Sequence, residues 1–567
     1  MPSPGWGMPP GPARQDDLAR MALMPMHPTP ANVADPEGES IRRGVMSALS
    51  GRRLLAQTRR NWLFLVLVTA GLVLRVLAQV AYRPALLFID SIKYLYGAYP
   101  GNDPPGYQLG LRAFLAVGNL PAAVAIQHLL GLAMAIALYV LLLRRGVPRW
   151  LAALATAPVL LDAYQLQIEQ SIMPDTLFEA LIVAGLVIML WRPRPVMWMV
   201  VAGGLLLGAS ATVRQIGEVF ILPALIFVLV VGGNWRGRLT KALALCLAFA
   251  FPILFMSFRN YLAIKSFSLA PYASATIYGR AAAAADCATL RLPASEQSLC
   301  PTPQQQAMGP DWLDHGAGSP IKTFKPPPGM RHVSVATDFS RRVFLQQPLP
   351  VAVAIAKDAI KLFAIQRVTS PGDTSIARWQ FQRGYPLYPP YITIHNGQLQ
   401  YVALTPTGHQ RIIASGQQFG GGQPAVSKSL ASFLRAYQLD GGYTPGPLLL
   451  VALLAGLAGS ATVLRRRASP GQRASAQACL LIFLSGAAVL LASDIFEFSW
   501  RYQLPALVTL PPAGALGVTV VIGYIAGRRR RPAGGQAASN FQSAVPPASP
   551  PADERPAQQR KDRASAG

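Results

Sequence analysis

The chain has 567 residues, of which 52% are hydrophobic and only 13% are charged, and its mean hydropathy is +0.32. Several apolar runs approach the roughly 20 residues that cross a bilayer, which the core of a soluble protein would not supply repeatedly. The formal net charge is +26, but the basic residues lie in short clusters beside the apolar runs and in the tails. This distribution argues against a nucleic-acid partner and indicates membrane topology instead.

Residues 1–60 are rich in Pro, Met and Arg and show no apolar period, so we expect a disordered tail. No short apolar stretch with a small-residue cleavage site precedes Trp62, and we therefore predict no cleavable signal peptide. The pairs Arg42-Arg43, Arg52-Arg53 and Arg59-Arg60 predict a cytoplasmic amino terminus, because positively charged flanks stay inside.

Ten apolar segments predict ten membrane spans in an all-α polytopic protein. Their approximate bounds are Trp62–Ala81, Pro121–Leu143, Leu151–Tyr164, Thr176–Trp191, Val196–Val213, Val219–Val231, Ala242–Phe258, Pro447–Leu464, Ala478–Ala492 and Leu504–Ala526. An even number of spans leaves both termini in the cytoplasm, and every short loop with an Arg cluster then falls on the inner side. The organisation is a membrane module (61–260), an outer segment (261–443), carboxy-terminal membrane helices (444–527) and a disordered cytoplasmic tail (528–567).

The acidic residues gather at the opposite, outer ends of these spans. They are Asp90, Asp103, Asp162, Glu169, Asp175, Glu218, Asp494 and Glu497. Ionisable groups at the ends of spans are costly unless they pair or meet water, so a one-sided set predicts a functional site. The alternative is that each is simply a hydrated loop residue.

The first outer loop, residues 82–120, carries charge where a connector needs none. The sequence from Phe88 predicts a helix at the membrane surface with Asp90, Lys93 and Tyr94 on one face. Asp103-Pro104-Pro105-Gly106-Tyr107 then predicts a stiff, extended turn, because each proline fixes its own backbone and restricts its predecessor.

The outer segment of roughly 180 residues is too long for a connector, and we expect it to be partly folded. Cys287 and Cys300 lie in it on the oxidising side and predict a disulfide, whereas Cys246 and Cys479 fall inside spans and predict packing residues. Residues 348–365 predict a helix along the outer membrane surface, and residues 385–404 a hairpin across Asn396-Gly397. Such a segment could equally be a lid or a stabilising cap.

The charged residues on the outer side offer a base and cations for the attack of a hydroxyl on a carbon atom that carries a phosphate. A carboxylate near a low-dielectric surface has a raised pKa and can take a hydroxyl proton, and Asp90 and Asp103 are the candidates. A departing phosphate needs a cation, and the outer-side candidates are Arg214, Arg501, Arg280 and Lys93. Arg214 and Arg501 are favoured because each lies where a span meets the outer surface, although salt bridges with Glu218 or Glu497 would also explain them.

Other chemistries find no support in the sequence. The histidines, among them His128, His315, His332, His395 and His409, lack metal-ligand spacing, so we expect no zinc site. A phosphate-binding Gly-x-x-x-x-Gly-Lys loop is missing, which argues against ATP-driven pumping. No cofactor is required, and a divalent cation (Mg or Mn) held by carboxylates with a lipid phosphate remains an option.

Asp90 with Tyr94, the Asp103-Pro104-Pro105 turn with Tyr107, the stretch Glu169–Phe178 and Arg501-Tyr502 together resemble the GT-C superfamily of membrane glycosyltransferases. The similar branches are the protein mannosyltransferases, the aminoarabinose transferases and the phospholipid-carrier-dependent bacterial transferases. The resemblance covers residues 63–278 and 478–526. It departs from the family at Ser91, where relatives often have a second acidic residue, and at Asp103, where they often have a basic one.

The resemblance implies transfer of a sugar from a polyprenyl-phosphate donor to a cell-envelope glycan, lipid or protein at the extracytoplasmic face of the cell membrane. Asp90 would be the general base, with Asp103 as the alternative. We expect substrate contacts from Tyr94, Tyr107, Glu169, Asp175, Glu218 and Glu497. Two other functions stay open: a transporter or flippase of a lipid-linked sugar, and a non-catalytic envelope scaffold.

Overall fold

The computed structural model describes residues 56–96, 101–231, 233–273, 277–385, 393–395, 398–405, 408–414, 419–422, 424–465 and 469–529. The chain divides into two units, residues 1–60 and 61–567, and the helices and strands named below all belong to the second. Apart from a few helical residues at their inner ends, the two predicted tails lie outside the described residues.

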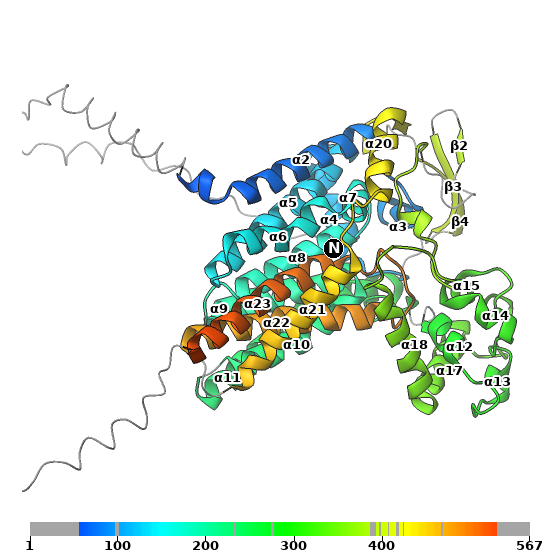
Figure 1. The fold of residues 1–567 in the computed structure, drawn as a ribbon. Helices are drawn as coiled ribbons and strands as arrows, with labels where there is room; N and C mark the ends of the chain where they lie inside the picture. The colour runs from blue at the N-terminus through cyan, green and yellow to red at the C-terminus, as the bar shows by residue number, and fades with distance from the viewer. Residues whose placement is uncertain are drawn as a thin grey trace, which may run out of the picture. The chain divides into compact units, whose positions relative to one another are not determined.

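A bundle of long, apolar helices forms the core of this unit (Figure 1). Its members are α2 (Trp62–Ala81), α5 (Leu120–Arg144), α6 (Arg149–Leu161), α8 (Asp175–Met189), α9 (Met197–Val213), η2 (Gln215–Phe220) with α10 (Ile221–Val230), α11 (Trp235–Ile264), α21 (Gly446–Ala461) with η5 (Thr462–Leu464), α22 (Pro470–Ser493) and α23 (Pro505–Arg529). Every predicted span coincides with one of these helical segments. Among the described residues, six helices are long and apolar enough to cross a membrane, or up to eight if two bent pairs each count once. The protein is therefore a multi-pass membrane protein, and the count of ten spans stays a prediction.

Two breaks in the bundle place acidic residues at helix ends. The third predicted span extends to about Tyr164, but α6 ends at Leu161 and a bend of 47° leads into α7 (Ala163–Gln170). Asp162 lies at the bend, where its side chain accepts a hydrogen bond from the backbone N–H of Tyr164. Pro174, which has no backbone N–H to donate within a helix, directly precedes Asp175, where α8 begins.

Two short helices fill the first outer loop, α3 (Ile89–Tyr96) and α4 (Gly106–Val117). The chain entering α3 is fixed to the turn between α7 and α8. Leu86 donates its N–H to the carbonyl of Gln170 at 3.0 Å, and its own carbonyl accepts from Ile172 at 3.1 Å. The chain that enters the predicted surface helix is thereby held beside the chain that enters the predicted fourth span.

The outer segment is folded, as expected, and is mainly helical. Its helices are α12 (Tyr278–Ala284), α13 (Ala294–Gln297), α14 (Pro303–Ala307), α15 (Gly309–His315), α16 (Pro320–Thr323), α17 (His332–Gln346), α18 (Pro348–Lys361), η4 (Ile376–Trp379) and α20 (Lys428–Leu439). A separate apolar core, with Tyr278 and Phe339 at its centre, holds the helices α12 to α18 together. Cys287 and Cys300 form the predicted disulfide beside it. Cys479 is buried in α22, in agreement with a packing role, and Cys246 is half-buried.

Two small antiparallel sheets complete the segment. Strands β2 (Thr393–His395) and β3 (Gln398–Thr405) pair with His395 opposite Gln398, which confirms the predicted hairpin; the turn residues Asn396 and Gly397 lie outside the described part. A third strand, β4 (Gly408–Ala414), extends this sheet. Strands β1 (Tyr82–Arg83) and β5 (Ala425–Val426) pair separately and join the end of α2 to the entry of α20.

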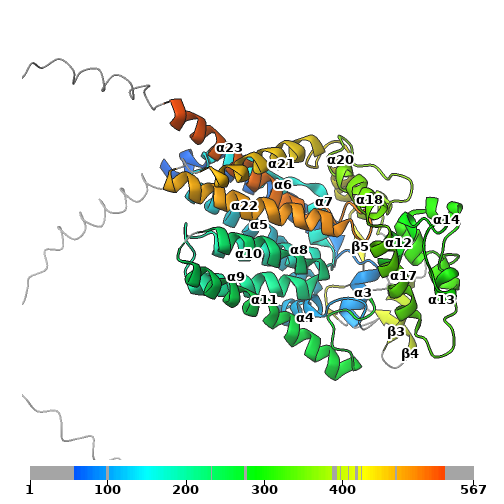
Figure 2. The same ribbon diagram turned by 90° about the horizontal axis from the view of Figure 1, so that it is seen from below.

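The helix predicted for residues 348–365 is found as α18. Figures 1 and 2 show it running across the direction of the bundle helices rather than along them. Leu349, Val353 and Ile360 are exposed on it, whereas Val351 and Asp358 are buried. This amphipathic surface fits the predicted location at the membrane surface, which stays a prediction.

The basic loops gather at the end of the bundle away from the outer segment. Arg145 donates to the carbonyl of Arg192, Lys241 donates to that of Pro195, and Ser475 donates to the carbonyl of Arg145. Four predicted inner loops are therefore neighbours, which agrees with the sidedness inferred from charge.

Candidate active site

Asp90 and Lys93 lie on the same face of α3, as predicted. Lys93 Nζ is 2.9 Å from Asp90 Oδ1 and 3.1 Å from Asp103 Oδ2, so one ammonium group joins the two candidate bases. Ser91 points elsewhere: its hydroxyl accepts from the N–H of Phe88 and contacts Met173 Sδ. Its position, where the resembled family often carries a second acid, serves here to start the helix.

The proline pair brings the Asp103 turn close to the end of α9. Gly106 opens α4, and a Cβ atom built there would lie 2.4 Å from the carbonyl oxygen of Thr212. Only a residue without a side chain permits this approach. The turn is consequently fixed beside Arg214, two residues beyond Thr212, where α9 ends and the backbone becomes extended.

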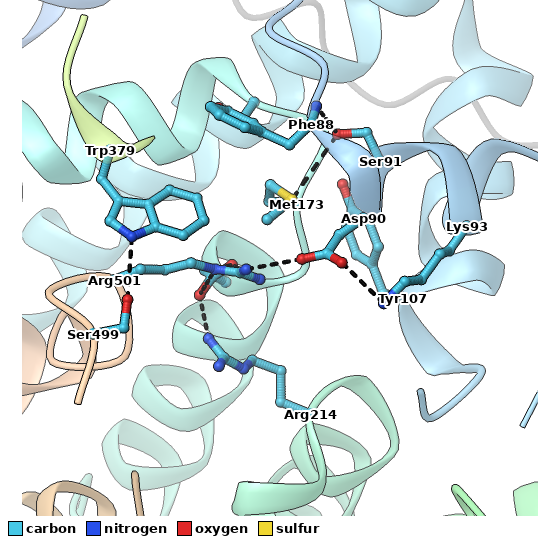
Figure 3. A network of polar contacts seen from close by, with 12 residues as sticks. Phe88, Asp90, Ser91, Lys93, Tyr107, Met173, Arg214, Trp379, Ser499 and Arg501 are labelled. Carbon is cyan, nitrogen blue, oxygen red and sulfur yellow. Dashed lines mark hydrogen bonds and ion pairs between the residues drawn. The ribbon is translucent and has the colours of Figure 1, made fainter. Parts of the chain in front are cut away.

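Asp175 is the centre of the site, because Arg501 and Arg214, both labelled in Figure 3, form ion pairs with it. Arg501 Nε lies 3.0 Å from Asp175 Oδ2 and Arg501 Nη2 3.0 Å from the same oxygen, while Arg214 Nη1 forms an ion pair with Asp175 Oδ1. Arg501 also reaches Asp90, with Nη1 at 3.1 Å from Oδ2. One guanidinium therefore links the carboxylates at the starts of α3 and α8, and a second guanidinium lies beside it.

The pairs differ in their access to solvent. The Asp175 side chain is 1% exposed and that of Arg501 5%, whereas Asp90, Lys93 and Asp103 are 25%, 21% and 35% exposed. The Arg501–Asp175 pair thus forms the floor of the site. Asp90, Lys93 and Asp103 form the part that an incoming molecule can reach.

Aromatic rings surround the charged groups. Tyr94 and Tyr107, both predicted, meet edge to face at 4.8 Å, and the Tyr107 hydroxyl donates to Gln127 Oε1 at 2.8 Å. The Tyr502 ring lies 4.8 Å from Arg214 Cζ, and the Trp379 ring lies 5.1 Å from Arg501 Cζ. Rings of this kind strengthen the charge pairs by excluding water.

The expectation of a raised pKa is wrong for Asp90. Burial by itself raises the pKa of this carboxyl, but the nearby charges of Lys93 and Arg501 outweigh it and hold the pKa below its ordinary range. Burial by itself lowers the pKa of Arg501, but the charges of Asp175 and Asp90 outweigh this effect and raise the pKa above its ordinary value. The guanidinium therefore stays charged. Asp90 is therefore a paired carboxylate in this structure.

Several predicted residues lie elsewhere. Arg280 is buried and forms an ion pair with Asp358 in the outer segment. Glu169 is fully buried between Arg75 and His128, with Nη2 and Nδ1 at 2.8 and 3.0 Å. Glu218 is exposed on η2, and Glu497 faces the outer segment, where Asp311, Arg378 and Arg280 influence its pKa. The salt bridges considered for Arg214 and Arg501 do exist, but their partners are Asp175 and Asp90 rather than Glu218 and Glu497.

Two residues of the site have no signal in the sequence. Trp379 lies in the long outer segment, far along the chain from Arg501, and its indole N–H donates to Ser499 Oγ at 3.1 Å. Neither residue belongs to a recognisable motif, and only the fold brings them together. A tryptophan among the few aromatic residues of a polar stretch is a weak hint at best.

A divalent cation does not fit these carboxylates as they stand. Both oxygens of Asp90 face cationic donors, Lys93 and Arg501, and both oxygens of Asp175 face Arg214 and Arg501. Among the described residues, no group of three or more His, Cys, Asp or Glu side chains could hold a metal ion. We therefore assign no residue to a metal.

Comparisons with known proteins find distant likenesses. No family model and no curated protein matches this chain. Among solved structures, the Saccharomyces cerevisiae protein O-mannosyltransferase Pmt1-Pmt2 complex bound to the sugar donor matches at 15% identity and a TM-score of 0.29, over 39% of this chain and 36% of that one. The Archaeoglobus fulgidus oligosaccharyltransferase AglB with an inhibitory peptide and a dolichol-phosphate matches at 13% and 0.36, over 87% and 53%. The apo form of the A. fulgidus oligosaccharyltransferase matches at 15% and 0.39, over 83% and 52%.

These solved structures are a protein O-mannosyltransferase and oligosaccharyltransferases. The chain spans about half the length of the oligosaccharyltransferases and about a third of the mannosyltransferase. Every TM-score is below 0.5 and every identity below 25%. The function of this chain is therefore argued from the residues of the site alone.

Proposed function

We propose that this protein transfers a sugar from a polyprenyl-phosphate donor to an acceptor hydroxyl. The observation that carries the proposal is the double guanidinium site, in which Arg214 and Arg501 meet on Asp175 directly beside Asp90. Forked guanidinium donors suit a phosphate group, and a carboxylate beside them suits a hydroxyl that must lose its proton.

The pairing of Asp90 suggests how donor binding activates the base. The donor phosphodiester accepts hydrogen bonds from Arg214 and Arg501, and Arg501 then exchanges its bond to Asp90 for one to phosphate. Asp90 loses a neighbouring cation, which raises its pKa toward the range where it accepts a proton. Asp175 keeps both guanidinium groups in place during this exchange, because it is buried beneath them.

The reaction balances with these groups alone. The acceptor oxygen attacks the anomeric carbon while its proton moves to an Asp90 oxygen. The bond between the anomeric carbon and the phosphate oxygen breaks, and its electron pair stays on the polyprenyl phosphate. The extra negative charge on the leaving group lies against Arg214 and Arg501, where preorganised donors stabilise it.

Asp90 is the better candidate for the base, and Asp103 is better suited to hold Lys93. Asp90 contacts both Lys93 and Arg501, whereas Asp103 forms its ion pair with Lys93. The pKa of a base next to the phosphate site changes when the donor binds. Asp103 would instead keep the ammonium group oriented toward the acceptor side.

The position of the site supports a lipid-linked donor. Its residues lie at the ends of α8, α9 and α22, beside helices with exposed apolar surfaces such as Phe251 and Phe255 on α11. A phosphate at this level would have its prenyl chain among the membrane lipids. By the charge rule this end is extracytoplasmic, so the acceptor would be a glycan, lipid or protein of the cell envelope.

The test is release of polyprenyl phosphate and transfer of labelled sugar by purified protein in lipid, with a small panel of polyprenyl-phosphate sugars. We expect Asp90→Asn to lower the turnover by about 10²- to 10⁴-fold, the usual contribution of a general base. Asp103→Asn should cost much less. Asp338→Asn, an exposed acid on α17, is the matched control and should behave as wild type.

Equal losses in Asp90→Asn and Asp338→Asn would exclude Asp90 as the base. A wild-type protein that is folded, binds the lipid and turns over none of the donors would overturn the transferase proposal. Movement of the intact lipid-linked sugar between leaflets would then favour the flippase, and a phenotype unaffected by Asp90→Asn would favour the scaffold.

A further inference from the structure

The turn that carries Arg501 is held by the outer segment from two sides. Residues 494–504 connect α22 to α23, and Arg501 lies in a turn of this loop, with hydrogen bonds from Tyr502 N–H to the Ser499 carbonyl and from Leu504 N–H to the Arg501 carbonyl. This short turn contains two aromatic residues, Trp500 and Tyr502, on either side of the arginine. Without outside contacts so short a turn would leave the guanidinium free to move.

The first contact comes from Trp379 at the end of η4 (Figure 3). Its indole N–H donates to Ser499 Oγ at 3.1 Å, and its ring lies over the Arg501 guanidinium at 5.1 Å. The same ring packs against Phe88, 5.5 Å between centroids, two residues before Asp90. Trp379 therefore touches both elements that the Asp90–Arg501 ion pair connects.

The second contact comes from the chain about ten residues earlier. The Trp500 indole N–H donates to the carbonyl of Val368 at 2.9 Å, and the Trp500 ring lies 5.4 Å from the guanidinium carbon of Arg367. Trp379 of the outer segment thus donates to the turn, and Trp500 of the turn donates to the outer segment.

Arg367 is itself anchored in the bundle. Its guanidinium bonds to both oxygens of Asp162, at 3.2 and 2.7 Å, and its side chain is only 5% exposed. The rings of Tyr164 and Tyr443 lie 4.7 and 5.3 Å away. Because Asp162 lies at the fixed bend between α6 and α7, this buried ion pair ties the outer segment to the membrane helices.

We infer that Arg367 and Trp379 are positioning residues that set the direction of the Arg501 guanidinium. The inference rests on the proposed function, because it makes the outer segment part of the donor-phosphate site. In this arrangement the segment is more than a cap. It keeps Arg501 aimed between Asp90 and Asp175, where one guanidinium can pass from carboxylate to phosphate without a search for its orientation.

The chain offers variants that separate the two contacts of Trp379. Trp379→Leu removes the ring and the N–H, Trp379→Phe keeps a ring over Arg501 but loses the N–H, and Ser499→Ala removes the acceptor only. Arg367→Met removes the anchor. Trp198→Phe, an exposed tryptophan on α9, is the matched control.

The first measurement is hydrogen exchange over residues 498–504 in lipid nanodiscs, which needs neither donor nor turnover. We expect exchange to rise about tenfold in Trp379→Leu and Arg367→Met, less in Trp379→Phe and Ser499→Ala, and not at all in Trp198→Phe. Unchanged exchange in both strong variants would overturn the inference. If Arg367→Met fails to fold, Trp379→Phe and Ser499→Ala still decide, because neither removes a buried charge.

The second measurement is binding of polyprenyl phosphate by native mass spectrometry, followed by the kinetic constants for the sugar donor. A positioning role predicts about tenfold weaker lipid-phosphate binding and a raised KM in Trp379→Leu, with partial recovery in Trp379→Phe. Raised exchange together with unchanged binding would overturn the link to the phosphate site. If the wild-type protein does not bind polyprenyl phosphate at all, the proposed function is contradicted. The exchange data would still test the positioning of Arg501.

Discussion

Asp175 has the least exposed side chain of the six charged groups at the site and contacts both guanidinium groups. It accepts from two guanidinium groups and is 1% exposed, so its charge is needed to keep two neighbouring cations together. The sequence suggested a substrate contact for it. From its position under Arg214 and Arg501 we propose that it orients these two guanidinium groups.

We therefore expect Asp175→Asn to be more harmful than a loss of one contact. Removing one partner of a buried charge network leaves uncompensated charge and costs about 3–5 kcal/mol of unfolding free energy. Turnover should fall by more than about 100-fold, because both cations lose their orientation. The unfolding midpoint in nanodiscs and the rate of sugar release measure the two effects. A variant as stable and as active as Asp440→Asn, an exposed acid after α20, would contradict this role.

Arg214 and Arg501 need not contribute equally. Arg501 bonds to two carboxylates and is nearly buried, whereas Arg214 is 15% exposed and bonds to Asp175. Arg501→Lys should therefore lose the bridge to Asp90, because an ammonium group cannot reach both acids as a planar fork does. We expect at least about a tenfold larger loss of turnover for Arg501→Lys than for Arg214→Lys. Equal losses measured by the same transfer assay would show that the bridge has no special role.

At the scale of elements, the loop between α22 and α23 contains two buried carboxyl groups, Asp494 and Glu497, that face charged residues of the outer segment. Burial raises the pKa of Asp494 to about 8, with Asp358 adding to the effect and Arg280 and Lys361 opposing it. Gln503 donates to Asp494 at 2.9 Å. At neutral pH this carboxyl is largely protonated in the folded protein.

The pKa of Glu497, in the same loop, is raised for the same reason as that of Asp494. Burial raises its pKa to about 8, Asp311 raises it further, and Thr374, Arg378 and Arg280 lower it. Both groups thus bind protons in the folded state at pH values where the unfolded chain, with pKa values near 4, has released them. Stability contributed by such groups is present at low pH and declines as the pH rises from about 4 to about 8.

The expected outcome is an unfolding midpoint in nanodiscs that decreases between pH 5 and pH 8.5. Asp494→Asn and Glu497→Gln should flatten this dependence, because an amide does not titrate, whereas Asp338→Asn should leave it unchanged. A midpoint that rises with pH over this range, or a slope unaffected by both variants, would contradict the sign derived from the two groups.

The same elements show what a sequence can predict. The helix with Asp90 and Lys93, the disulfide Cys287–Cys300 and the hairpin at Asn396-Gly397 depend on neighbours close in the chain, and they are found. Arg501, by contrast, is joined to Asp90 across 411 positions and to Asp175 across 326. Local patterns identified these residues as candidates through their place at the ends of spans, but not as partners.

The partners of the candidates that lie outside the site could not be predicted for the same physical reason. Arg280 pairs with Asp358, 78 positions away, because α12 and α18 pack together. Glu169 pairs with Arg75 across 94 positions inside the bundle. A charge pattern reports which end of a span a residue occupies, whereas the pairing is decided by helix packing that leaves no local signal.

At the scale of the whole molecule, charge and chemistry are separated along the bundle. The acidic and guanidinium groups of the site lie at the end that carries the outer segment, and the Arg-rich loops contact each other at the other end. Such a distribution fits the positive-inside rule with the site outside. It also fits a reaction in which the donor arrives within the membrane and the acceptor from the envelope.

This sidedness can be measured on intact cells with a membrane-impermeant maleimide. Asp338→Cys places a thiol on the exposed surface of α17, and Arg236→Cys places one in the basic first turn of α11. We expect the first to react in intact cells and the second only after permeabilisation, because arginine-flanked loops remain in the cytoplasm. The reverse pattern would put Asp90 and Arg501 on the cytoplasmic side, where a donor and an acceptor of the envelope could not meet them.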